Sequence, residues 1–252
     1  KVLPVHAMVD TGMGRQGFGL ETAARDLLDL RRFAGLRLEG IATHYPVADS
    51  TGDPFTAAQI TRLKGLLAAL KNLGVDNVRV HGANSAGVID HPDPVYTLAR
   101  PGIMCMGVWP TDQIPTPNPI RPVLRWVTHV AQVRTLPPGH SVSYGRTYIT
   151  EGGMTAAMLP VGYADGYRLA FSNKAEVLIR GQRCPVRGRV CMDQTVVDVS
   201  HVPEVARGDE VALAGSQGED AITLEELAAH ASTIPYEILT GIGRRVKRVY
   251  VN

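Results

Sequence analysis

The sequence Asp10-Thr-Gly-Met-Gly-Arg-Gln-Gly-Phe18 separates a strand-like segment from a helix-like segment. The apolar residues before it suggest a strand interrupted by Pro4: Val2, Val5, Ala7 and Val9. The apolar residues after it recur at helical spacing: Leu20, Ala23, Ala24, Leu27 and Leu28. The sequence therefore predicts a strand-to-helix turn, which is where α/β proteins place their chemistry.

A dinucleotide-binding turn is the first alternative for this stretch, because residues 12–17 match G-x-G-x-x-G and Glu39 follows at the usual distance of ~20 residues. Two features argue against it. In that motif the acidic residue ends the second strand, whereas here the predicted strand continues past Glu39 to Thr43 and His44. Asp10 also enters the turn where a pyrophosphate would lie. A nicotinamide-dependent oxidoreductase is therefore disfavoured.

Composition excludes several classes of protein. The 252 residues are 44% hydrophobic and 20% charged, as in globular proteins, and the net charge of +2 gives no footprint for nucleic acid or an anionic membrane. Cys105, Cys184 and Cys191 are odd in number and lack metal-ligand spacing, so we expect buried thiols, no metal and a reducing, cytoplasmic compartment. No apolar run approaches the ~20 residues of a membrane span.

Strand-and-turn units follow one another over residues 1–120. The predicted strands are 2–10, 36–42, 77–80 and 96–99, and a helix is predicted from an Asp53 cap and Pro54 to Gly74. Polar residues follow each strand, as at the active-site end of a (β/α)8 barrel. Since such a barrel has eight strands, we expect 1–120 to be a partial, second-half barrel that lacks about 120 preceding residues.

A second, mainly β domain is predicted for residues 121–252. A proline-rich linker at 110–122 precedes it. The expected strands are 124–136, 142–149, 154–161, 176–179, 187–190, 195–199, 210–214 and 246–251. Gly181-Gln182 is the expected hairpin tip, Thr223 to Glu226 a capping box, and Pro235 to Leu239 a short helical turn.

These segments resemble those of the alanine racemase family, the fold-type III enzymes that use pyridoxal 5'-phosphate (PLP). The resemblance rests on Asp10-Thr-Gly-Met-Gly-Arg15, Thr43-His44, Asn84-Ser-Ala86, Ala99-Arg-Pro-Gly102, Ser143-Tyr-Gly145, Gly162-Tyr-Ala-Asp-Gly166, Gly188-Arg-Val-Cys-Met-Asp193 and Pro235-Tyr236. It covers essentially the whole chain and corresponds to the C-terminal two-thirds of such an enzyme. It implies the second half of a TIM-type barrel followed by a C-terminal β domain.

The implied activity is interconversion of L- and D-alanine, with one base on each face of the substrate. PLP makes the α-carbanion accessible. The resemblance implies that Tyr144 is one base and that the PLP-bound lysine is the other. That lysine belongs to the family's first barrel strand, and Lys1 does not replace it, so we expect the chain by itself to be inactive. By composition, Tyr144 would instead be a half-buried strand tyrosine.

The resemblance assigns cofactor-binding roles to residues at the predicted strand ends. His44 would pack on the PLP ring and contact Tyr144 and Arg100, and Arg100 would face the pyridine nitrogen. The phosphate would be held by Ser85, Gly102, Ile103 and Tyr236. An arginine can only donate, so the pyridine nitrogen would stay unprotonated. The alternatives are a structural role for His44, a surface cation at Arg100 and a helix N-cap at Ser85.

Substrate binding is implied for Arg15, Tyr163 and the Met192 backbone N–H, with Asn84 and Asp193 behind them. In the family, the residues corresponding to Tyr163 and Met192 reach the neighbouring subunit, so a homodimer with shared active sites is implied. By composition, Met192 would be a core residue. Asp193 has an open alternative as a strand-end turn residue.

One position departs from the family pattern. Many alanine racemases carry a carbamylated lysine where this chain has Met8, so Arg15 must be held in another way, by a chloride ion or another side chain. Strict alanine preference is therefore open, and a serine or broad-specificity racemase is the close alternative. A PLP-binding barrel without catalysis is the rival of another class. The second domain and Tyr144 argue against it.

Overall fold

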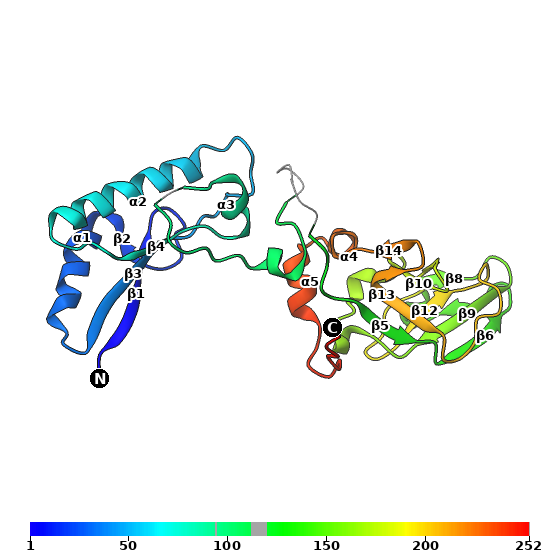
Figure 1. Cartoon of the computed structure of the whole chain (residues 1–252). Coiled ribbons are helices and arrows are strands. Elements are labelled where there is room, and N and C mark those ends of the chain that lie inside the picture. The colour runs from blue at the N-terminus through cyan, green and yellow to red at the C-terminus, as the bar shows by residue number, and fades with distance from the viewer. Residues whose placement is uncertain (94, 112–119, 252) are drawn as a thin grey trace. The chain divides into compact units, whose positions relative to one another are not determined.

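The computed structural model describes residues 1–93, 95–111 and 120–251. The chain divides into two compact units, Lys1–Arg121 and Pro122–Asn252 (Figure 1). Most of the predicted proline-rich linker falls on residues 112–119, outside the described residues. Each unit is described by itself.

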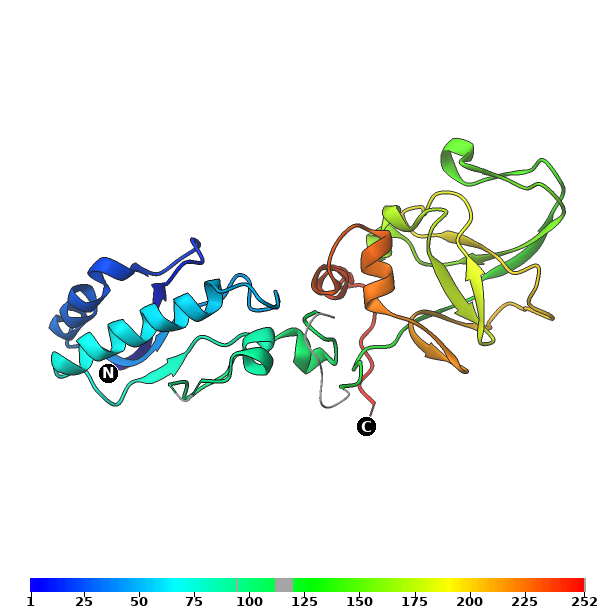
Figure 2. The ribbon, with the colours of Figure 1, turned by 90° about the horizontal axis from the view of Figure 1, so that it is seen from above.

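Unit 1 is built on a parallel sheet with the strand order β2-β1-β3-β4. Its strands are β1 (Leu3–Asp10), β2 (Phe18–Gly19), β3 (Leu36–Ala42) and β4 (Arg79–His81). Its helices are α1 (Leu20–Asp29), α2 (Phe55–Asn72) and α3 (Ser85–Asp90), with 3₁₀ turns at Leu30–Arg32 and Ile103–Met106. Figure 2 shows α1 and α2 side by side along the sheet.

The two faces of this sheet differ. One face forms the hydrophobic core with α1 and α2, and its strand residues include Ala7, Val9, Ile41 and Val80. Side chains alternate between faces along a strand. Met8, Ala42 and His81, which are paired in register, therefore lie on the opposite face. Polar residues that follow the strands are brought to one edge, because parallel strands end together.

The strand predictions in unit 1 hold for β1 and β3 and need correction elsewhere. The third strand begins at Arg79 rather than 77, because Asn77 has a φ of 55°, which a strand residue does not adopt. Residues 96–99 are not a strand. Thr97 donates its backbone N–H to the Val80 carbonyl at 2.9 Å, but the Val80 N–H donates to the Thr97 hydroxyl, also at 2.9 Å, instead of to a strand carbonyl.

The prediction for α2 is confirmed at both ends within a residue. Asp53 Oδ1 accepts the backbone N–H of Phe55 at 2.8 Å, and Gly74 has the left-handed φ of 73° that ends the helix. Leu63, Leu66 and Leu70 are buried. Leu73, which follows the last residue of the helix, is 49% exposed.

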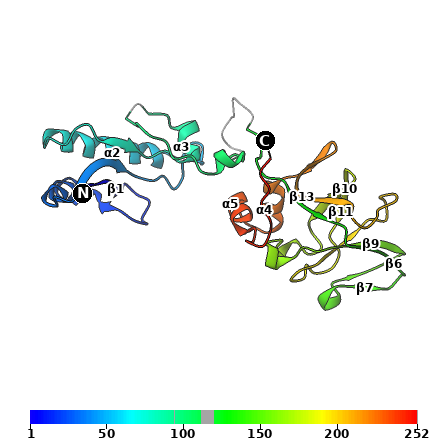
Figure 3. The ribbon, with the colours of Figure 1, turned by 60° about the horizontal axis from the view of Figure 1, so that its bottom comes forward.

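Unit 2 consists mainly of antiparallel β-structure (Figure 3). One sheet contains β5 (Trp126–His129), β10 (Glu176–Ile179), β11 (Gln182–Pro185), β13 (Glu210–Gln217) and β14 (Asp220–Ile222). A second contains β6 (Gln132–Leu136), β9 (Met154–Leu159) and β12 (Thr195–Asp198), and β7 (Ser141–Val142) pairs with β8 (Tyr148–Ile149). Two helices follow, α4 (Leu224–His230) and α5 (Pro235–Gly241).

Several predicted strands of unit 2 differ from the structure. Residues 124–136 form two strands, because β5 pairs with β13 and β6 with β9. Residues 142–149 are broken by a 3₁₀ turn at Tyr144–Arg146, which is flanked by Ser143 with a φ of 61°. Residues 187–190 and 246–251 are not strands, and Gly188 has a φ of 78°.

The predicted turns and helix starts of unit 2 agree with the structure to within one residue. The hairpin tip between β10 and β11 is Arg180-Gly181, one residue earlier than expected, because Gln182 pairs with Ile179. The capping residue of α4 is confirmed, since Thr223 Oγ1 accepts the Glu226 N–H at 3.0 Å. The predicted helical turn at Pro235 is the start of α5.

Candidate active site

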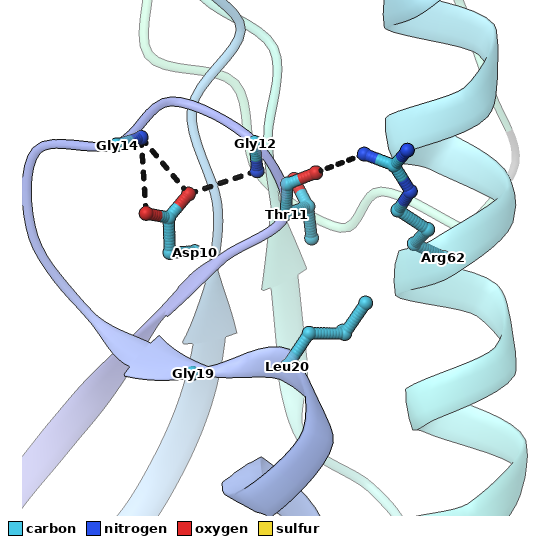
Figure 4. A pocket seen from close by; sticks show the side chains of 7 residues that line it. All are labelled: Asp10, Thr11, Gly12, Gly14, Gly19, Leu20 and Arg62. Carbon is cyan, nitrogen blue, oxygen red and sulfur yellow. Dashed lines mark hydrogen bonds between the residues drawn. The ribbon is translucent and has the colours of Figure 1, made fainter.

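In the turn after β1, the Asp10 carboxylate accepts hydrogen bonds from the backbone N–H groups of the turn. Asp10 accepts the N–H groups of Gly12 at 2.8 Å and Gly14 at 3.0 Å, as Figure 4 shows. It also accepts the N–H of Met13 at 2.8 Å. The hydrogen bond from the Gly12 N–H, followed by those from the other two N–H groups, lowers the pKa of Asp10. The amides that would face a pyrophosphate in a dinucleotide site are thus already bonded. This geometry argues against the nicotinamide-dependent alternative.

A cavity of about 390 Å³ lies beside this turn, lined by Asp10, Thr11, Gly12, Gly14, Gly19, Leu20 and Arg62. Arg62 donates to the Thr11 carbonyl at 2.7 Å, as Figure 4 shows, and its guanidinium stacks on the Phe55 ring with 5.5 Å to the centroid. Arg62 therefore ties α2 to the strand-end turn.

A buried polar group holds the ends of β1 and β3 together. The hydroxyls of Thr11 and Thr43 are 2.6 Å apart, and Gln59 on α2 donates to Thr11 Oγ1 and to the His44 carbonyl, at 3.1 Å each. All three of these polar side chains are buried. Because a buried polar group needs a partner, these bonds fix the backbone of His44 relative to the strands.

Arg100 is the centre of the strand-end site. Its guanidinium donates to the Thr43 carbonyl at 2.8 Å and to the His81 carbonyl at 3.0 Å. It also contacts His81 Nδ1 and lies 3.2 Å from His44 Nδ1. The alternative of a surface cation is wrong, since this guanidinium is half-buried among acceptors from two strands.

The two histidines around Arg100 are held in the neutral form. Burial, then the charge of Arg100 and then that of Arg15, lowers the pKa of His44. Burial, Arg100 and His6 together lower the pKa of His81 to about 4. Both rings can therefore accept a hydrogen bond at neutral pH.

Ser85 and the turn at Gly102 form a cluster of small donors and acceptors. Ser85 Oγ accepts the N–H of Gly102 at 2.9 Å and that of Met104 at 3.4 Å, and Ile103 between them is buried. Ser85 is not the helix cap, so that alternative is wrong. Asn84 caps α3 by accepting the Gly87 N–H at 3.0 Å, and its amide donates to the Tyr45 carbonyl at 3.1 Å.

Unit 2 contains a separate cleft of about 650 Å³. Its lining gathers residues far apart in the sequence: Ser143, Tyr144, Tyr163, Cys191, Met192, Asp193 and Gln194. Three of the residues predicted to touch substrate, Tyr144, Tyr163 and Met192, are among them. Their side chains are 73%, 46% and 55% exposed, respectively. The composition-based alternatives, a half-buried strand tyrosine and a core methionine, are therefore both wrong.

The backbone next to Tyr144 is strained. Ser143 has a φ of 61°, a conformation that is rare outside glycine, and its hydroxyl donates to the Arg189 carbonyl at 2.5 Å. Close to it, a Cβ on Gly188 would lie 2.5 Å from the Val142 carbonyl, so only glycine allows the two segments to approach. Strain of this kind is typical of functional sites.

The segments carrying Tyr163 and Met192 are bonded to each other. Tyr163 donates its N–H to the Cys191 carbonyl at 3.0 Å, and Ala164 donates to the Met192 carbonyl at 3.0 Å. Arg245 bridges the carboxylates of Asp165 and Asp193, and its Nε lies 2.6 Å from Asp165 Oδ1. Asp193 thus has a partner that the sequence did not reveal.

The remaining predicted residues are distributed between the units. Arg15 is exposed in the turn after β1, and Tyr236 lies on α5 with 39% exposure. Residues that sequence reasoning did not select are His6, His81, Thr43, Ser143 and Cys191. Of these, Thr43, Ser143 and Cys191 lie within the motifs quoted for the family resemblance, and His81 carried a usable signal because it directly follows the predicted strand 77–80.

Residues 1–93, 95–111 and 120–251 contain no group of three or more His, Cys, Asp or Glu that could hold a metal ion. In the same ranges, no helix has the length and apolar character needed to cross a bilayer.

The fold and site together define a class. A parallel α/β unit presents a cation, neutral imidazoles, a hydroxyl and turn amides at its strand ends, and a β domain presents a tyrosine-lined cleft. Residues 1–110 match the family description "Alanine racemase, N-terminal domain", and residues 123–250 match "Alanine racemase, C-terminal domain". The chain belongs to the alanine racemase family.

Curated relatives agree over almost the whole chain. The alanine racemase of Halothermothrix orenii is 41% identical to this chain, and the match covers 100% of this chain and 66% of the relative. That of Symbiobacterium thermophilum is 47% identical, covering 98% of this chain and 65% of its own length. The chain thus spans slightly less than two thirds of these relatives.

Solved structures share the fold. The alanine racemase from Bacillus anthracis with bound L-Ala-P has a TM-score of 0.92 at 34% identity, and the match covers 100% of this chain and 65% of that one. The alanine racemase from Bartonella henselae with covalently bound pyridoxal phosphate has a TM-score of 0.85 at 31% identity, covering 98% and 66%. The architecture of the family is a TIM barrel followed by a C-terminal β domain.

Proposed function

We propose that this chain is the part of a PLP-dependent racemase that interconverts L- and D-alanine by proton transfer between two bases, with Tyr144 as one of them. The observation that carries the proposal is the cleft of unit 2, where Tyr144, Tyr163 and Met192 meet although they are far apart in sequence. Membership of the alanine racemase family supports it.

The strand-end residues fit PLP by their chemistry. Arg100 has donors only, which suits an unprotonated ring nitrogen, and its carbonyl partners leave it rigid. Ser85 Oγ accepts the Gly102 N–H, so its own hydroxyl hydrogen can still be donated to a phosphate, and hydroxyls beside such turns commonly bind phosphate. Bound PLP would stabilise negative charge at the substrate α-carbon.

The chain's own residues would then bind substrate and move protons. Tyr144 would exchange a proton with the substrate α-carbon on one face. Arg15 and the Met192 N–H would hold the substrate carboxylate. We infer that none of the five lysines, at 1, 64, 71, 174 and 247, corresponds to the family's PLP lysine. We assign the second base to that lysine, which the family carries before this segment.

The cleft in unit 2 indicates which residues each subunit of the expected homodimer would contribute to an active site. If Tyr163 and Met192 serve the neighbouring subunit's active site, Tyr144 serves it too, because all three line one cleft. Each active site would then combine the strand-end residues of one subunit with the cleft residues of the other.

Isotope exchange tests the base role in the full-length protein. In Tyr144→Phe, racemisation should fall by about 10²–10⁴-fold, the range for loss of a general base. The α-proton of one enantiomer should still exchange with solvent deuterium through the remaining base, and that of the other should not. Tyr250→Phe is the control, since Tyr250 is 93% exposed outside the cleft. Equal, modest loss of exchange for both enantiomers would refute the role.

Subunit mixing tests the shared site. Arg100→Leu and Tyr144→Phe subunits are each expected to be inactive. When they are co-assembled, a shared site regains about a quarter of wild-type activity, because one of two sites in each heterodimer is intact. Mixtures that stay inactive, although heterodimers form, would place Tyr144 and Arg100 of one subunit in the same site.

Because Met8 stands where many family members carry the lysine that braces the arginine, a serine or broad-specificity racemase is the second candidate. An apolar pocket rejects an added hydroxyl by only about 10²-fold. Comparing kcat/KM for the two amino acids decides between them, and a ratio near one would favour the broad-specificity enzyme.

A further inference from the structure

Two histidine rings meet on the face of the unit 1 sheet opposite the hydrophobic core. His6 Nδ1 lies 2.7 Å from His81 Nε2, with ring centroids 5.0 Å apart. His6 belongs to β1 and His81 to β4, and β3 runs between these two strands. The contact therefore spans β3. A side chain on β3 that pointed to the same face would block it, so the residue of β3 between the two rings must be small.

Gly40 is that residue. It pairs with His6 in the β1–β3 register, and a Cβ at this position would lie 2.4 Å from His6 Nδ1. A register shift between Val5 and His6 sets His6 opposite Gly40 instead of Glu39. A glycine inside a strand often marks such a close approach. The histidine, the glycine and the bulge are thus three separate features that produce one contact.

The direction of the hydrogen bonds follows from Arg100. A guanidinium has no acceptor, so His81 Nδ1 must accept from Arg100. Neutral His81 then carries its proton on Nε2 and donates it to His6 Nδ1. Burial, Arg100 and His6 lower the pKa of His81 to about 4, which keeps this ring neutral at physiological pH. Arg100 therefore donates to His81, and His81 in turn donates to His6.

We propose that His6 is a positioning residue for Arg100. By accepting the Nε2 proton of His81, His6 fixes that ring so that Nδ1 stays aimed at the guanidinium. A partner on the far side of an imidazole orients the ring and raises its basicity, as is well established for histidines that bind metals. The consequence for catalysis rests on the proposed function, in which Arg100 faces the cofactor ring.

The expected effect is moderate, because Arg100 keeps other acceptors. The carbonyls of Thr43 and His81 would still hold the guanidinium after His6 is lost. One hydrogen bond of ordinary strength corresponds to a change of roughly 3- to 10-fold in an equilibrium or rate. This is the size of change expected for the mobility of Arg100 and for kcat.

Nuclear magnetic resonance of the full-length protein, labelled with ¹⁵N in histidine and arginine, tests the positioning directly. The wild type should show a ¹⁵N–¹⁵N coupling between His81 and His6 across the hydrogen bond. In His6→Leu, the Arg100 side-chain N–H protons should exchange with solvent roughly 3- to 10-fold faster. His6→Asn should restore slow exchange, because its amide oxygen can accept near the position of Nδ1. No coupling in the wild type, or unchanged exchange in His6→Leu, would overturn the proposal.

A second variant keeps the histidine and moves it. Gly40→Ala should push the His6 ring away and reproduce the faster Arg100 exchange of His6→Leu. Gly35→Ala is the matched control, since a Cβ there meets no atom within 4 Å. Circular dichroism confirms that each variant is folded. Wild-type exchange in Gly40→Ala would contradict the proposal.

Kinetics then separate this proposal from the proposed function. With PLP bound, kcat should fall roughly 3- to 10-fold in His6→Leu, with little change in KM, and recover in His6→Asn. If the exchange differences occur but the wild type does not racemise amino acids, the proposed function fails while the role of His6 in holding Arg100 stands. Unchanged kcat in an active enzyme, despite faster Arg100 exchange, would overturn the catalytic consequence.

Discussion

The strand-end site of unit 1 and the cleft of unit 2 hold their functional side chains in opposite ways. Arg100 is half-buried and bonded to acceptors from two strands, so its position is fixed within unit 1. Tyr144 is 73% exposed, and only its backbone is constrained, by the positive φ of Ser143. The comparison teaches that one site is organised through side-chain hydrogen bonds and the other through backbone geometry.

The physical reason lies in the charges. A guanidinium removed from water must regain its hydrogen bonds, so burying Arg100 requires a network around it. A phenol at the surface keeps its water and needs no such network. The cleft side chains are therefore free to be ordered by whatever covers them, which in the proposed dimer is the neighbouring subunit's active site.

The largest expected effect would break this comparison directly. Arg100→Leu should lower the free energy of unfolding by about 2–4 kcal/mol, because the charged hydrogen bonds are lost and the Thr43 carbonyl loses its donor, although the His81 carbonyl still accepts the Thr43 N–H. Tyr144→Phe should change it by less than about 0.5 kcal/mol, as for other exposed positions. Urea denaturation of both variants measures this. Similar losses in the two would show that the sites do not differ as described.

The next effect tests the backbone of the cleft. A Cβ on Gly162 would lie 2.1 Å from the Cys191 carbonyl, so Gly162→Ala must push apart the segments that carry Tyr163 and Met192. Overpacking of this kind destabilises by about 1–3 kcal/mol. Gly152→Ala, where a Cβ meets nothing within 4 Å, is the control. Thermal unfolding compares them, and equal midpoints would contradict the backbone argument.

A smaller effect compares a helix cap from each unit. Loss of a helix cap typically lowers the free energy of unfolding by about 1 kcal/mol, which is the loss expected for Thr223→Ala. Asn84→Ala should lower it by more. Both side chains accept an N–H of the first helical turn, but the Asn84 amide also donates to the Tyr45 carbonyl. Denaturant midpoints of the two variants measure the difference. A greater loss at Thr223 would contradict the additional role of Asn84.

The last prediction concerns the pH dependence of the stability of unit 1. The folded pKa of His81 is about 4, below the unfolded value of ~6.5, so between these values only the unfolded state takes up the proton. Stability from this residue is present above pH ~6.5 and declines as the pH falls towards 4. The stability advantage of the wild type over His81→Leu should therefore shrink across that window. Denaturation at several pH values measures it, and a constant difference would refute the assignment.

Local sequence rules predicted much of the fold. The pattern of apolar residues located β3 and α2 within a residue or two, and Thr223 was recognisable as a cap from its neighbours. These features depend on interactions close in sequence. The failures at residues 96–99 and 187–190 arose where a side-chain hydroxyl or a left-handed glycine replaced strand pairing. Such competition is not visible in a pattern of apolar residues.

The candidate site divides in the same way. The residue types of Tyr144, Arg100 and His44 and their order along the chain are enough to indicate the family. Their contacts did not follow from order. Asn84 and Ser85 are adjacent, and only the structure showed which one caps the helix and which one binds the Gly102 turn.

The sequence by itself determined the family, the two units and the residue types that the chemistry requires, because these depend on local patterns and on order along the chain. Tertiary structure decided which groups meet. It placed Tyr144 with Tyr163 and Met192 in one cleft, and it brought His6 to His81 across Gly40. Contacts between residues distant in sequence depend on strand register and close packing, and a single chain of letters contains no direct measure of either.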